Sequence, residues 1–111
     1  MLAVVLLLSG TVAASTRIDV QLDEWTLGFE ELEVAAGRME FRVVNRGRMP
    51  HNFRLDWKDA RGEAYAVETP LLQPGQEYSL IVTLGSGTYE AWCTVPGHGG
   101  LGMAGVVIVT P

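Results

Sequence analysis

The stretch TYEAWCTVPGHGGLGMAGVVIVT, residues 88–110, decides the fold prediction, because two strand patterns flank one glycine-rich loop. Residues 88–93 show the period of two that is typical of a half-buried strand. Residues 104–110 form an apolar run of strand length. We therefore predict two neighbouring strands, joined by a loop that begins at Cys93 and ends at Met103.

The rest of the chain repeats this pattern of short strands. Apolar side chains recur with a period of two in residues 17–22, 39–44, 51–57 and 77–84. Turn signals that contain glycine separate these runs. Residues 58–71 are less regular and predict either a short helix or an irregular hairpin. Short strands at regular spacing predict an all-β fold, a Greek-key β-sandwich or barrel of about seven to eight strands.

Length and charge exclude several classes of protein. The chain has 111 residues, of which 48% are apolar, so it suits one domain with a modest core. The net charge is −5. An acidic domain is poorly suited to binding nucleic acid, which requires Lys and Arg against phosphates.

The first residues read as an export signal. The apolar run Leu2–Leu8 is too short to span a bilayer, and Val12–Ala14 supplies small residues suited to cleavage. No Lys or Arg precedes the run, so we expect either that the start of the signal lies upstream or that the segment stays as an uncleaved anchor. The alternative to an export signal is a buried first strand. We predict a leader in residues 1–15 and one domain in residues 16–111. The domain is then exported to the periplasm or the extracytoplasmic face, with membrane contact only through an uncleaved leader.

The loop after the strand at 88–93 carries an unusual set of metal-binding side chains. Cys93 is the only cysteine of the chain. Four residues lie between Cys93 and His98, and four more lie between His98 and Met103. Thiolate, imidazole and thioether groups favour copper, and His51 offers a second imidazole. Two His and one Cys in a plane, with a weak axial Met, form a blue-copper electron-transfer site. The alternative is that these side chains are ordinary core residues.

Two motifs resemble the cupredoxins, the family of small blue copper proteins. They are PHNF at 50–53 and YEAWCTVPGHGGLGM at 89–103, and the resemblance extends over residues 17–111 through LEVAAG, FRVVNRG and LQPGQEYSL. It implies one type 1 copper ion per chain. The ligands it implies are His51, Cys93, His98 and Met103.

The resemblance also implies roles for neighbouring residues. Asn52 would tie the two ligand loops together through Thr94, and Tyr89 would form a buried tyrosine corner. Trp92 lies on the opposite strand face from Cys93, where it either packs under a loop or offers a second route for electrons.

The function that the resemblance implies is electron transport. The protein would shuttle single electrons between redox partner proteins that dock at an exposed, apolar edge around His98. With two histidines in the chain, no second copper site can be built, so an enzyme with a small-molecule substrate is not expected. The alternatives are an envelope copper carrier or storage protein that uses the same site, and a metal-free interaction module.

Overall fold

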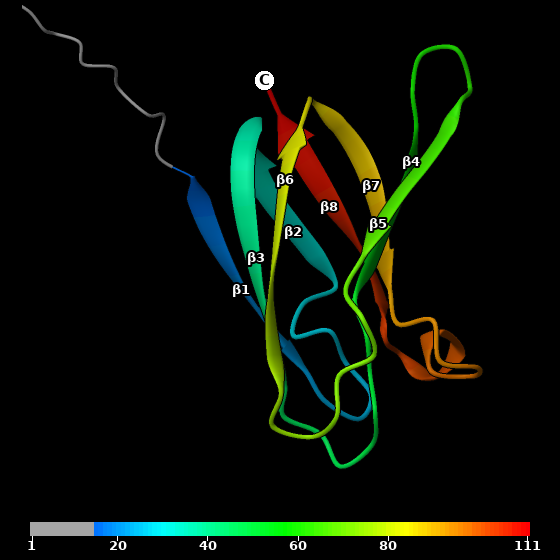
Figure 1. Ribbon diagram of the computed structural model, residues 1–111. Coiled ribbons are helices and arrows are strands. Elements are labelled where there is room, and N and C mark those ends of the chain that lie inside the picture. Colours follow the sequence, from blue (N-terminus) through cyan, green and yellow to red (C-terminus); the bar gives the residue numbers. More distant parts are fainter. Residues whose placement is uncertain (1–14) are drawn as a thin grey trace, which may run out of the picture.

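Residues 15–111, the part of the chain that the computed structural model describes, form eight strands in two sheets (Figure 1). The all-β prediction of seven to eight strands is therefore confirmed. Apart from Ser15, the leader predicted at residues 1–15 lies outside the described residues. The strands are β1 (Thr16–Leu22), β2 (Glu31–Ala35), β3 (Gly37–Asn45), β4 (Arg54–Lys58), β5 (Ala64–Glu68), β6 (Glu77–Leu84), β7 (Gly87–Trp92) and β8 (Ala104–Thr110), with a short 3-10 helix, η2 (Gly99–Leu101).

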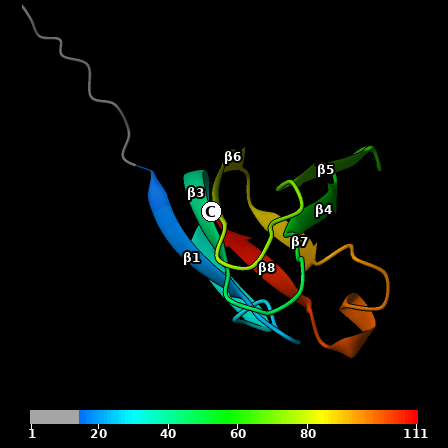
Figure 2. The same ribbon diagram turned by 60° about the horizontal axis from the view of Figure 1, so that its bottom comes forward.

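The two sheets have different sizes. The smaller has the order β1-β3-β6, with β1 parallel and β6 antiparallel to β3. The larger has the order β2-β8-β7-β4-β5, in which only the β2–β8 pair is parallel. The chain crosses between the two sheets after β1, β2, β3, β5 and β6 (Figures 1 and 2). The β1–β2, β3–β4 and β7–β8 connections all come to the lower end of Figure 1.

The core forms where the inward faces of the strands meet. In β1 and β3 the buried positions alternate along each strand as the sequence pattern predicts. Phe41 of β3 lies 5.5 Å, ring centre to ring centre, from Phe53, and both side chains are fully buried. Burial of one such side chain contributes about 1.5–3 kcal/mol. In β6 the period of two holds, but Tyr78, the second residue of the strand, is 41% exposed, whereas Leu80 and Leu84 are buried.

The strand expected at 51–57 starts only at Arg54. Before it, His51 forms an isolated bridge with Leu72, and the N–H of Phe53 donates to Oγ1 of Thr69 at 3.1 Å. These buried residues therefore lie outside the sheet, but their backbone groups are still hydrogen bonded. The segment at 58–71 is the turn and second strand of the β4–β5 hairpin, so of the two alternatives the hairpin is correct.

None of the helical structure within residues 15–111 has the length and apolar character that crossing a membrane requires.

Candidate metal centre

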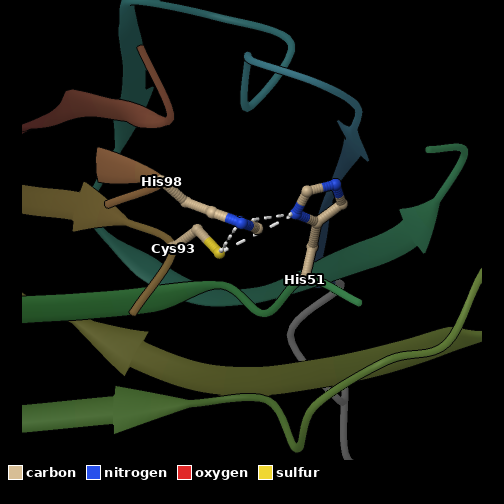
Figure 3. A group of neighbouring side chains, drawn as sticks. All are labelled: His51, Cys93 and His98. Carbon is tan, nitrogen blue, oxygen red and sulfur yellow. Dashed lines mark hydrogen bonds between the residues drawn. The ribbon is translucent and has the colours of Figure 1, made fainter. Parts of the chain in front are cut away.

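Three side chains converge, one from the β3–β4 connection and two from the β7–β8 connection (Figure 3). Nδ1 of His51 lies 3.1 Å from Nδ1 of His98, and Sγ of Cys93 lies 4.0 Å and 3.7 Å from these two nitrogens. All three residues are buried. The structure thus brings together three of the four residues that the sequence predicts as ligands, with their donor atoms facing one another.

The spacing of these donor atoms suits a metal ion. The point in their plane that is equally far from all three lies about 2.1 Å from each atom. Bonds from zinc to imidazole nitrogen and to thiolate sulfur, for comparison, are about 2.0 Å and 2.3 Å long. Two imidazoles and one thiolate that surround such a point have the composition of a trigonal copper site.

Backbone hydrogen bonds close the loop that carries Cys93 and His98. The N–H of Cys93 donates to the carbonyl of Met103 at 3.0 Å, and the N–H of Met103 donates to the carbonyl of His98 at 3.1 Å. Gly102 completes the turn with a φ of 128°, and a Cβ there would lie 2.6 Å from the carbonyl oxygen of Trp25. Only glycine fits this position without strain.

Met103 is fully buried at the end of this loop, one residue before β8. Its backbone is hydrogen bonded to both Cys93 and His98, so it belongs to the same closed turn. Its role as the axial ligand stays a prediction.

The tie between the two ligand loops is present as predicted. Oδ1 of Asn52 accepts from the N–H of Thr94 at 2.7 Å, and its Nδ2 donates to Oγ1 of Thr94 at 2.9 Å. Since Asn52 follows His51 and Thr94 follows Cys93, the amide fixes the two ligand-bearing segments side by side. The tyrosine corner is also confirmed, because the hydroxyl of buried Tyr89 donates to the carbonyl of Gly85 at 2.7 Å.

Two residues of the β1–β2 connection reach the site although the sequence did not single them out. Nε2 of His51 is hydrogen bonded to the carboxylate of Glu24. The ring of Trp25 packs edge-to-face on His98, with 4.9 Å between ring centres. Carboxylates often accept from metal-binding histidines. The chain has 13 acidic residues, however, and no sequence spacing links position 24 to position 51.

The electrostatics of the site favour a neutral imidazole at His98 and an ionised carboxylate at Glu24. Burial lowers the pKa of His98. The hydrogen bond from the N–H of Arg48 lowers the pKa of Glu24 most, and the hydrogen bond with His51 lowers it further. Neutral imidazole is the form of histidine that binds metals.

The His98 edge differs from the exposed edge that the sequence predicted. His98 is only 4% exposed, because Trp25 lies against its ring. Within residues 15–111, every fully buried side-chain nitrogen or oxygen has a hydrogen-bond partner, whereas Nε2 of His98 has none. This nitrogen therefore reaches the surface. Trp25, whose ring packs on His98, is 37% exposed, and Leu101, whose N–H donates to the carbonyl of His98, is 57% exposed.

Trp92 lies on the outer face of β7, as the strand alternation predicts. It is half-buried, its Nε1 donates to the carboxylate of Asp56, and the guanidinium of Arg54 lies 6.0 Å from the ring centre. Together with Asp56 and Glu90 it lines a hollow of about 620 Å³ behind the Cys93–His98 loop. Gly99 and Gly100 line the same hollow, and a Cβ at Gly99 would lie 3.8 Å from the Trp92 ring, so the loop beside Trp92 is the one that carries the ligands.

Comparison with known proteins gives a consistent result. The family model for copper binding proteins of the plastocyanin/azurin family matches residues 15–110. An auracyanin from the photosynthetic bacterium Roseiflexus castenholzii, in its dithionite-reduced form, has a TM-score of 0.75 at 24% identity, over 89% of this chain and 100% of that one. Auracyanin A from Chloroflexus aurantiacus, titled a "blue" copper protein, has a TM-score of 0.72 at 22% identity, over 87% of this chain and 100% of that one.

A second group of similar structures comprises variants of amicyanin. One oxidised variant is 31% identical, with a TM-score of 0.64, over 89% of this chain and 86% of that one. No curated protein sequence matches the chain significantly.

Proposed function

Since this chain belongs to the plastocyanin/azurin family of copper-binding proteins and its cofactor is one type 1 copper ion, we propose that it is an exported carrier of single electrons. The observation that supports this proposal is the buried triangle of two imidazole nitrogens and one sulfur, whose size suits one metal ion. Such a donor set stabilises copper in both of its common oxidation states.

The proposed ligands are the four residues that the sequence selects. His51, Cys93 and His98 would supply three strong donors to copper, and the thioether of Met103 would supply a fourth, weak one. A copper ion with these four ligands has no open position for a substrate, so the proposed chemistry is outer-sphere electron transfer rather than catalysis.

Electrons are proposed to enter and leave at the His98 edge. At 4% exposed, His98 is the least buried of the four proposed ligand residues, and the apolar ring of Trp25, which packs on it, is partly exposed. Small apolar surfaces suit the brief contacts that redox partner proteins make.

Copper titration of the metal-free protein tests this proposal. We expect one Cu(II) per chain to produce an intense blue absorption that dithionite bleaches and a mild oxidant restores. Cys93→Ser is the matched control, since it keeps the small polar side chain but removes the copper–thiolate bond, and it should fold without the blue band. A wild-type protein that binds only Cu(I), without colour, would refute the electron carrier and favour a copper carrier.

A further inference from the structure

We propose that Glu24 is a positioning residue for the metal centre: its carboxylate fixes the ring of His51 with Nδ1 toward the metal, and its negative charge stabilises oxidised copper. The measurements on the copper-loaded protein rest on the proposed function, whereas the orientation of His51 can be tested in the metal-free protein.

The structure provides a fitted place for the Glu24 carboxylate. One oxygen accepts from the N–H of Arg48 at 2.8 Å, and the other is hydrogen bonded to Nε2 of His51. The chain makes room for it at Gly47, where a Cβ would lie 2.0 Å from Oε2 of Glu24 and 2.9 Å from Nε2 of His51. Any side chain at position 47 would displace the carboxylate.

The segment that cradles Glu24 is itself held in place by a buried side chain. Oδ1 of Asn45 accepts from the N–H of Gly47 at 2.8 Å, and its Nδ2 donates to the carbonyls of Met49 and Leu72 at 2.8 Å and 2.9 Å. Asn45 is fully buried. Since Leu72 also pairs with the backbone of His51, one network fixes the main chain of the ligand and the cradle of its carboxylate partner.

The hydrogen bond to Glu24 decides which nitrogen of His51 carries the proton. An ionised carboxylate only accepts, so Nε2 of His51 must donate. In a neutral imidazole the other nitrogen, Nδ1, then has its lone pair free. That nitrogen faces Sγ of Cys93 and Nδ1 of His98, so the proton arrangement that Glu24 imposes is the one that metal binding requires.

The charge of Glu24 acts on the copper as well. Its side chain is only 20% exposed, so water screens it incompletely. Copper(II) with one thiolate and one nearby carboxylate is a neutral group, whereas copper(I) with the same partners carries one net negative charge. The carboxylate therefore favours the oxidised state and lowers the reduction potential.

Three variants separate these effects. Glu24→Ala removes the hydrogen-bond acceptor and the charge, while Glu24→Gln keeps an acceptor oxygen but removes the charge. Glu30→Gln is the matched control, since it removes the same charge from the exposed end of the same connection. We expect Glu24→Ala to release copper to a chelator about 10-fold faster or more, as is usual when a partner of a metal-bound histidine is lost. Glu24→Gln should raise the reduction potential and stay blue, and Glu30→Gln should match the wild type in both.

Nitrogen-15 NMR of the metal-free protein provides the readout that does not depend on copper. We expect the wild type to show a protonated Nε2 and an unprotonated Nδ1 for His51, and Glu24→Ala to lose this fixed tautomer. A wild type without that tautomer would overturn the proposal, and so would a Glu24→Gln potential equal to that of Glu30→Gln. If the wild type shows the tautomer but never turns blue, the proposed function fails while the positioning role stands.

Discussion

Replacing Asn52 with alanine should cost far more stability than replacing its partner Thr94 with valine. The alanine variant loses both hydrogen bonds to Thr94 and a third, at 3.2 Å, to Glu68. The N–H of Thr94 then lacks its acceptor, which costs about 1–3 kcal/mol, and loss of the hydroxyl contact adds about 1 kcal/mol. We expect a total of about 2–4 kcal/mol for this variant.

The valine variant keeps the shape of Thr94 and its backbone bond to Asn52. It removes only the bond from Nδ2 to the hydroxyl, so we expect a loss of about 1 kcal/mol. Urea unfolding of the metal-free proteins, followed by tryptophan fluorescence, measures both free energies. Equal losses in the two variants, or a loss below about 1 kcal/mol for Asn52→Ala, would show that the tie between the ligand segments carries little of the stability.

Three further expectations concern the metal centre and its surroundings. Added imidazole should restore the blue band of His98→Gly but not of His51→Gly, since Nε2 of His98 reaches the surface whereas His51 is fully buried beneath Glu24; equal rescue would contradict this difference in access. Met103→Leu should stay blue with a raised reduction potential, because a weak donor to copper(II) is lost, and voltammetry showing a drop would exclude the axial role. Trp92→Phe should cost about 1 kcal/mol in thermal or urea unfolding through the lost Nε1 bond and leave the spectrum unchanged. A shifted blue band in this variant would mean that the side chain influences the copper directly.

The sequence predicted most of the strands because their buried faces alternate with exposed ones. The pattern fails where a residue is buried without being paired in a sheet. Residues 51–53 are an example, because they are buried but lie outside β4. Periodicity also does not show how deeply a side chain is buried, since Tyr78 has the right period but lies near the exposed start of β6. Periodicity reports which face of a segment is buried, and it does not report where pairing begins.

The candidate ligands were predictable for a different reason. Cys93, His98 and Met103 are rare residue types at regular spacing on one loop, so the local sequence contains the signal. Glu24 reaches His51 only because the β1–β2 and β3–β4 connections meet at the same end of the sandwich. Contacts between distant loops depend on the three-dimensional arrangement of the strands, and nothing in either local stretch encodes them.

The position of β8 in the larger sheet has a consequence for the order of events during synthesis. This strand, residues 104–110, lies between β2 and β7 and pairs with both. A nascent chain that ends before residue 104 therefore leaves β2 without a neighbour in its sheet and β7 with β4 alone. The N–H of Cys93 also donates to the carbonyl of Met103, directly before β8, so the pocket around its thiol is complete only when residues 103–110 have joined the sheet. All the ligand-bearing segments are then in place only after β8 has paired, and until that point oxidants compete with the metal for the same sulfur.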